Sequence, residues 1–199
     1  MVKMTANQEK DAVDIVTDTL YSISFLEAIS KTIFDPNRNN IEVGTFYNQW
    51  LEATAAHERK IPFNLGVFSG YLFVGILFTK ENWADLIPDE KVEDVSPDWG
   101  LVGVSYVSPE HPSPKLKHFI RRLRNALGHA SFFFEIPNDL HSVDELHSRI
   151  NIVFQDQNPK NPSDVFETRL TLTQLEQLIK KFQSLVHKDV ANKYGLKNP

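Results

Sequence analysis

Three residues with the spacing R-N-x-x-x-H, Arg124, Asn125 and His129, stand near the end of the basic segment 115–134. An arginine guanidinium can hold a phosphate through parallel hydrogen bonds and stabilise charge that builds on its oxygens. A histidine titrates near neutral pH and can take or supply a proton. Asn125, about one helical turn before His129, is placed to orient the imidazole or to bond the phosphate. These residue types predict chemistry at a phosphodiester, and we expect it to need no metal or other cofactor.

Positive charge gathers around these residues. From His111 to Phe134 the chain has five lysines and arginines and no acid. The whole chain has a net charge of −5, so the residues outside this segment carry −5 minus +5, or −10. A local cation cluster on an acidic protein predicts a site for an anion, here a phosphodiester. The predicted RNA- or phosphate-binding residues are Lys115, Lys117, His118, Arg121 and Arg122. RNA fits this chemistry because its 2′-hydroxyl is a nucleophile beside each phosphodiester.

The basic segment has the pattern of an amphipathic helix with Ser113 as a candidate N-cap. One stripe is apolar and faces the core: Leu116, Phe119, Ile120, Leu123, Leu127 and Ala130. Two adjacent polar stripes face away from it: Lys115, His118, Arg122, Asn125 and His129 in one, and Lys117, Arg121, Arg124 and Gly128 in the other. In an ideal helix Arg124 and His129 lie about 140° apart. We therefore expect them to bracket a group over the polar face rather than to contact each other.

The composition limits the alternatives. The 199 residues are 41% hydrophobic and include no cysteine, which permits a real core and excludes a disulfide framework, a thiolate metal site and a cysteine nucleophile. The spacing of His141 and His147 fits no tetrahedral metal motif, so we predict no metal ligands. The first residues lack the apolar core of a signal peptide, and we expect a cytoplasmic protein.

The uncharged run Ile61–Thr79 is 19 residues long, which is borderline for a membrane span of about 20 apolar residues. It contains Pro62, Asn64, Ser69 and three glycines, and its flanking charges are of both signs. We therefore favour a central buried helix, in which Gly66 and Gly70 allow another helix to approach closely. A protein anchored to a membrane through this run is the weakest of the functional hypotheses.

The remaining periodicities predict a mainly α fold of about five helices, with a small antiparallel sheet inserted before the last helix. We expect one domain over residues 1–199, and helices over 5–34, over 43–59 and from Pro62 to about Trp83 or Leu86. A long surface loop over 88–114 contains an extended piece at 101–107. The β insertion, 131–170, holds strands near 132–136, 150–154 and 165–170. A capping box of Thr173 and Glu176 opens the last helix, and a flexible tail follows over 190–199.

The Arg124-Asn125-x-x-x-His129 motif on a basic helix resembles the HEPN superfamily (higher eukaryotes and prokaryotes nucleotide-binding domain). Its members are α-helical domains with an R-x(4–6)-H motif, commonly with a polar residue after the arginine. The resemblance implies a HEPN-like helical bundle with Arg124, Asn125 and His129 as catalytic residues. Active members are metal-independent endoribonucleases, dimers in which two motifs face one cleft, and they leave a cyclic 2′,3′-phosphate and a 5′-hydroxyl. The β insertion and the loop 88–114 depart from a minimal HEPN domain.

Two functional hypotheses follow. The first is a homodimeric HEPN-type endoribonuclease in a toxin, phage-defence or RNA-processing role, whose partners are RNA and a cognate antitoxin or nucleotidyltransferase, with no membrane. The second is a catalytically silent HEPN-like module that binds a nucleotide, RNA or a protein. In the second case Arg124 forms a surface salt bridge and His129 is a cation at the carboxyl end of a helix.

Overall fold

The computed structural model describes residues 6–33, 35, 37–38, 40–54, 65–137 and 148–195. The chain divides into two compact units, Met1–Tyr71 and Leu72–Pro199. The expectation of a single domain stays a prediction. Both the R-N-x-x-x-H motif and the sheet belong to the second unit.

The first unit contains the helices α1 (Ala6–Ile33) and α2 (Val43–Thr54), close to the predicted ranges. Residues 55–59 of the second predicted helix lie outside the described residues. The two helices pack through aromatic rings: the ring centroid of Phe25 lies 5.6 Å from that of Phe46 and 5.0 Å from that of Trp50. Tilted and edge-to-face pairs of this kind stabilise a helix contact beyond their buried area.

The third helical stretch changes its winding along its length. An α-helix, α3 (Leu65–Leu72), continues into a π-helical turn, η1 (Phe73–Phe78), then α4 (Thr79–Trp83) and a 3₁₀ turn, η2 (Ala84–Leu86). The predicted end of this helix is confirmed, and its predicted start at Pro62 lies outside the described residues. Within the part of the chain that the structure describes, no helix is both long and apolar enough to span a membrane.

The close helix contact lies at Gly75 rather than at the predicted Gly70. A Cβ added at Gly75 would come within 2.6 Å of the Ile179 side chain, whereas one at Gly70 would have no neighbour within 4 Å among the described residues. The prediction for Gly70 was therefore wrong. Gly75 lies in η1, and its missing side chain is what lets that turn approach the last helix, α7 (Leu172–Tyr194).

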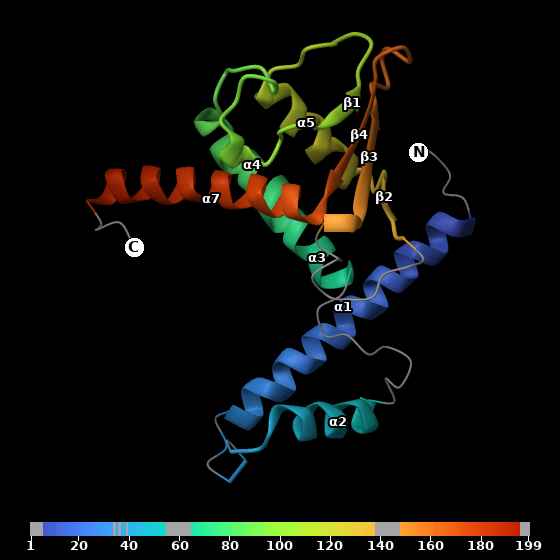
Figure 1. Cartoon of the computed structure of the whole chain (residues 1–199), viewed down its shortest axis with the longest axis vertical. Helices are drawn as coiled ribbons and strands as arrows, with labels where there is room; N and C mark the ends of the chain where they lie inside the picture. Colours follow the sequence, from blue (N-terminus) through green and yellow to red (C-terminus); the bar gives the residue numbers. More distant parts are fainter. Residues whose placement is uncertain are drawn as a thin grey trace. The chain divides into compact units, whose positions relative to one another are not determined.

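The described residues form an antiparallel sheet of four strands in the order β1-β4-β3-β2 (Figure 1). The strands are β1 (Ser105–Val107), β2 (Phe132–Glu135), β3 (Asn151–Gln157) and β4 (Val165–Thr171). The three strands of the insertion and the last helix confirm the predicted fold class, mainly α with a small sheet. The extended piece near 101–107 also exists, and it adds β1 to the edge of the sheet beside β4.

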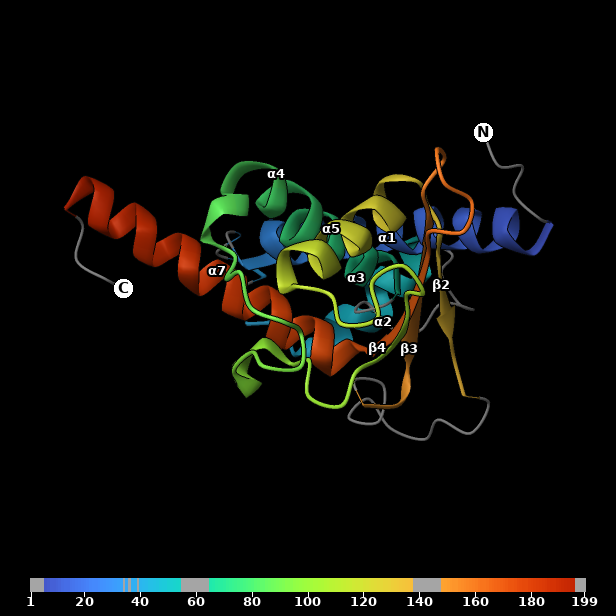
Figure 2. The same cartoon turned by 90° about the horizontal axis from the view of Figure 1, so that it is seen from above.

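Helices of the second unit cover one side of this sheet. Figure 2 shows α4, α7 and the motif helix α5 (Leu116–Gly128) on the same side of β2, β3 and β4. The core between them is aromatic and aliphatic, and the rings of Phe119 in α5 and Phe166 in β4 meet edge to face at 5.5 Å. Phe119 and Phe154 are fully buried. Burial of this apolar stripe fixes which way the polar side chains of α5 point.

Both predicted helix caps differ from those observed. Ser113 donates to Glu93, and Lys115 is the N-cap residue of α5 without a side-chain cap. The capping box of α7 is formed by Thr171 and Gln174. Two overlapping patterns, starting at 171 and 173, fit the motif, and β4 decides between them because it pairs through Thr171. The same helix continues to Tyr194, beyond the expected start of the tail, and ends where Gly195 adopts a φ of +63°.

The segment 88–114 is only partly a surface loop. Trp99, at the end of a 3₁₀ turn η3 (Pro97–Trp99), and Leu101 are buried. Its acidic stretch lies against the start of α5, where the Leu116 N–H donates to the Glu90 carbonyl at 2.7 Å and the Val92 N–H donates to the Pro114 carbonyl at 3.0 Å. Acids that are distant in sequence therefore reach the basic helix.

Candidate active site at the end of the motif helix

The carboxyl end of α5 is closed by a turn that leaves His129 exposed. The Ser131 N–H donates to the Ala126 carbonyl at 2.8 Å, and the Ala130 N–H donates to the Leu127 carbonyl at 3.0 Å. These two bonds define a Schellman motif, which needs a left-handed residue after the cap. Ala130 fills that position with a φ of +52°, although the position usually holds glycine. The imidazole of His129 thus stands at a fixed helix end.

A cavity of about 260 Å³ opens beside this helix end, and we call it the motif cavity. From α5 it is lined by Arg121, Arg122, Asn125 and His129; from the hairpin between β3 and β4 it is lined by Asp156, Asp164 and residues 157–159. Arg124 does not line it. The structure thus brings two of the three motif residues to one cavity and turns the third away.

Asn125 is held by its neighbours. Its Nδ2 donates to Asp156 Oδ2 at 3.1 Å, and its Oδ1 accepts from Arg124 Nη1 at 3.3 Å. Arg124 Nε lies 2.8 Å from Glu81 Oε1 of α4, with about a third of the arginine side chain exposed. The amide bonds of Asn125 therefore go to Arg124 and Asp156 rather than to the imidazole of His129. Glu81 is the counter-ion of the motif arginine.

Arg122 is buried, so the prediction that it lies on the solvent-facing side of the helix was wrong. Its side chain is 4% exposed, and its Nε lies 3.0 Å from Asp156 Oδ2. Its Nη2 donates to the backbone carbonyls of Asp156 and Asp164 at 3.1 Å and 3.0 Å. The guanidinium also lies 5.7 Å from the ring centre of Phe166. The helical wheel placed Arg122 in a polar stripe correctly, but the sheet packs against that stripe.

Asp164 is the second counter-ion of Arg122. Its Oδ2 lies 3.4 Å from Arg122 Nη1 and accepts from Asn158 Nδ2 at 3.1 Å. Burial raises the pKa of Asp164, but the hydrogen bond from Asn158 and the charge of Arg122 outweigh it and lower that pKa below its usual range. The carboxylate is therefore ionised at neutral pH. Arg122, Asp156 and Asp164 together fasten the β3–β4 hairpin to α5.

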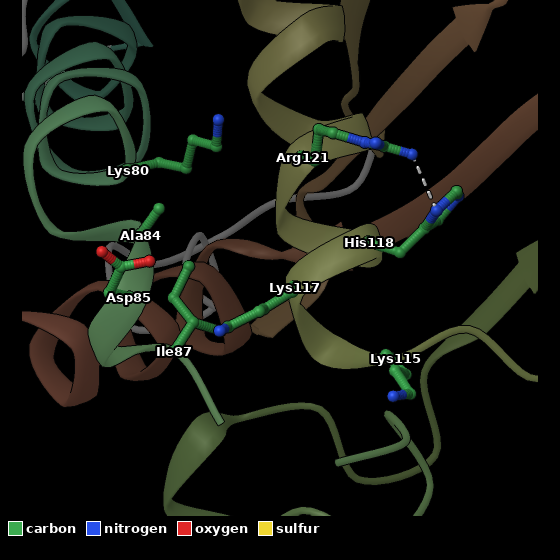
Figure 3. A pocket seen from close by; sticks show the side chains of 8 residues that line it. All are labelled: Lys80, Ala84, Asp85, Ile87, Lys115, Lys117, His118 and Arg121. Carbon is green, nitrogen blue, oxygen red and sulfur yellow. Dashed lines mark hydrogen bonds between the residues drawn. The ribbon is translucent and has the colours of Figure 1, made fainter. Parts of the chain in front are cut away.

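A second cavity, of about 330 Å³, lies between α4–η2 and α5, and we call it the cation cavity. Its cations are Lys80, Lys115, Lys117 and Arg121; the other lining residues are Ala84, Asp85, Ile87 and His118. Figure 3 shows Lys80 on one wall and Lys117 with Arg121 on the other. The structure thus brings together four predicted anion-binding residues, although Asp89 pairs with Lys115 at 2.5 Å. Lys80 was not predicted as a binding residue, because in the sequence alone the charges next to Ile61–Thr79 are only the flanks of a possible membrane span.

His118 carries no charge to this cavity at neutral pH. Burial of the ring, and after it the positive charges of Arg121, His111 and Arg122, lower the pKa of His118 to about 4. Arg121 Nη2 lies 3.0 Å from His118 Nδ1 and is the donor, since the guanidinium has no acceptor. His118 therefore helps to position the Arg121 guanidinium.

Among the described residues, no group of three or more histidines, cysteines, aspartates or glutamates is placed to hold a metal ion. His141 and His147 lie outside those residues.

The motif on α5, the helices around it and the small sheet before α7 agree with a comparison to known families. The family model described as HEPN pEK499 p136 matches residues 4–193. The chain therefore belongs to the HEPN pEK499 p136 family, and the predicted HEPN membership is confirmed. Searches of curated proteins and of solved structures return no match.

Proposed function

We propose that this HEPN protein is a metal-independent endoribonuclease whose chemistry takes place in the motif cavity. The observation that carries the proposal is the lining of that cavity, in which an exposed His129 stands with Asn125 and Arg121 around a space of about 260 Å³. Arg121 also lines the cation cavity, so positive charge continues beyond the motif. An imidazole that can exchange a proton, placed beside cationic groups, suits a phosphodiester substrate.

The proposed reaction is an internal transfer at phosphorus. The 2′-oxygen attacks the neighbouring phosphorus and forms a 2′,3′-cyclic phosphate, while the bond from phosphorus to the 5′-oxygen breaks. One base takes the proton from the 2′-hydroxyl, and one acid gives a proton to the departing 5′-oxygen. Atoms balance without water or a cofactor, and the products are a cyclic phosphate and a 5′-hydroxyl. His129 is the proposed proton-transfer group.

A homodimer fits this scheme. Each chain supplies a single motif histidine, whereas the reaction needs a base and an acid. Within one chain, moreover, Arg124 is turned to Glu81 and does not line the cavity that holds His129. We propose that two motif helices face one cleft, so that both histidines and both Arg124 side chains reach the scissile phosphate. A solution mass near 22.8 kDa, the mass of one chain, at micromolar concentration would contradict this arrangement.

The second candidate is the catalytically silent binding module. It is favoured by the contacts of the motif itself, because Glu81 and Asp156 already engage Arg124 and Asn125. Such contacts give these residues a structural role without catalysis. The two candidates share the same cationic surface and differ only in cleavage. A toxin or defence role, a cognate antitoxin or nucleotidyltransferase partner and a cytoplasmic location remain proposals tied to the first candidate.

Replacement of His129 separates the two candidates. His129→Ala should lower cleavage of single-stranded RNA in EDTA by at least about 100-fold, the lower range for loss of a general acid–base group. Its thermal unfolding should match that of the wild type, because the side chain is exposed. Arg124→Ala should lower cleavage similarly and also weaken RNA binding. If the wild type binds RNA without cutting it, or if His129→Ala cuts as fast, the silent module is the better account.

A further inference from the structure

We propose that the cation cavity is a phosphate subsite that holds an RNA phosphate several nucleotides away from the one cleaved at His129. The ligand chemistry is a phosphate ester, which an RNA strand or a free nucleotide can supply, and the observations favour the strand. The inference rests on the proposed function for the identity of that strand. It assigns a binding role to Lys80 and to the walls formed by α4–η2.

The first support is uncompensated charge. Four cations and one acid, Asp85, line the cavity, and of the four cations Lys115 is paired with Asp89. Lys117 and Arg121 form no ion pair with any described acid, in contrast to Arg122 and Arg124 on the same helix. Lys80 is only loosely compensated, since its Nζ lies 3.6 Å from Glu81. Like charges that line one cavity repel each other, and a bound anion removes that repulsion.

The second support is the form of the walls. Ala84 and Ile87 give one side of the cavity an apolar surface, and Ile87 is buried. Figure 3 shows Lys80 and Lys117 extending into the space between the two walls from opposite sides. An apolar wall lowers the local dielectric and so strengthens the attraction between a phosphate and nearby ammonium groups. The cavity thus offers a phosphate a bounded place rather than a flat charged surface.

The third support is continuity with the motif. Lys117, Arg121, Asn125 and His129 recur every four residues, so they form a row that winds about 120° around the helix, from the stripe of Lys117 and Arg121 to that of Asn125 and His129. The row is about 18 Å long, from 12 residues at 1.5 Å each. Arg121 lines both cavities, so no separate surface intervenes between them. A strand with one phosphate at Lys80 and Lys117 therefore passes Arg121 on its way to His129, which favours RNA over a free nucleotide.

The test measures binding of a single-stranded RNA oligonucleotide to full-length His129→Ala by fluorescence anisotropy at several salt concentrations. Lys80→Ala and Lys117→Ala, added singly, should weaken binding and reduce the slope of log K against log salt by about 0.7 each, the value for one phosphate contact with a single strand. Asp85→Asn should strengthen binding, since it removes the one acid of the lining. A gain of affinity cannot arise from misfolding.

The matched control is Lys188→Ala, a loss of one exposed lysine on α7 away from both cavities, which should leave affinity and slope unchanged. Equal effects of Lys188→Ala and Lys117→Ala would overturn the subsite, since only net charge would then matter. Unchanged binding in the Asp85→Asn and Lys117→Ala variants would overturn it as well.

Competition distinguishes the two sources of phosphate. Adenosine monophosphate and inorganic phosphate should displace the oligonucleotide only at concentrations far above those of unlabelled RNA. If adenosine monophosphate displaces the oligonucleotide as effectively as unlabelled RNA does, the cavity is a site for a free nucleotide, and the proposal that an RNA strand occupies it is overturned. All binding is measured in the His129→Ala background, without cleavage. If the wild type does not cut RNA but the lysine variants show the expected salt slopes, the ribonuclease is refuted and the subsite is supported. If instead the wild type cuts RNA but the salt slopes of Lys80→Ala and Lys117→Ala equal that of the parent protein, the ribonuclease is supported and the subsite is refuted.

Discussion

Arg121 and Arg122 are neighbours in sequence and have opposite roles in the structure. Arg121 is exposed, touches His118 and lines both cavities. Arg122 is buried between Asp156 and Asp164 and joins the β3–β4 hairpin to the helix. The same charge, one residue apart, thus lines open cavities in one case and is used by the fold in the other.

The difference shows that a segment without acids in sequence need not lack acids in space. Counter-ions reach α5 from three other parts of the second unit: Asp89 from the loop, Glu81 from α4, and Asp156 with Asp164 from the hairpin. These acids lie 26 to 43 residues from their partners in sequence. Residues 115–134 contain five cations, and three of them form ion pairs with these acids. Lys117 and Arg121 form none with any acid that the structure describes.

The largest expected effect is on stability and concerns Arg122. Arg122→Ala should lower the free energy of unfolding by about 3–5 kcal/mol, because it leaves two carboxylates without their buried partner. Arg121→Ala should change it by no more than about 0.5 kcal/mol, as is usual at an exposed position. Urea denaturation of the two variants and the wild type measures both values. Equal losses from the two substitutions would refute the division of roles between these arginines.

A smaller effect is expected at the motif arginine. Glu81→Gln should free Arg124 for a phosphate and raise RNA affinity by up to about fivefold, since a partly exposed ion pair is worth about 0.2–1 kcal/mol. Glu81 also lies near Lys80, so the same substitution is to be made in Arg124→Ala. The gain should vanish there. A gain that persists without Arg124 would show that Glu81 acts on the cation cavity instead.

The smallest effect concerns pH and His118. The folded pKa of about 4 lies below the ordinary value of 6.5, so between these pH values the unfolded chain binds a proton that the folded chain does not. The free energy of unfolding should therefore fall as the pH falls from about 6.5 towards 4. His118→Gln should show a shallower fall in urea denaturation over this window. The same slope in both proteins would mean that His118 titrates normally.

The local features of the fold were predictable because they depend on short-range periodicity. The strands of the insertion follow from spacing, and so does the apolar stripe of α5 except for Ala130, which is exposed in the turn after the helix. The burial of Arg122 does not, because a helical wheel orders residues around an axis without showing which side a sheet will cover. Asp156 and Asp164, at the ends of a polar turn, were the available signal, but their link to Arg122 depends on the register of β3 and β4 against α5.

The candidate site was predictable by residue type and less so by arrangement. Asn125, His129, Lys117 and Arg121 were all predicted, and they line the two cavities. Lys80 and Glu81 were missed because a helix about 40 residues earlier in the chain brings them to α5. Pairing between distant segments decides which cations remain available, and single-sequence patterns contain no direct record of it.

The most direct test of the account replaces one 2′-hydroxyl of the substrate. An RNA oligonucleotide cut by the wild type in EDTA is compared with the same oligonucleotide carrying a single 2′-deoxynucleotide on the 5′ side of the cleaved bond, and the products are identified by mass spectrometry. We expect a 2′,3′-cyclic phosphate and a 5′-hydroxyl from the first substrate, and no cleavage at the modified position of the second. Cleavage of the modified bond, or a linear phosphate formed without a cyclic intermediate, would contradict it.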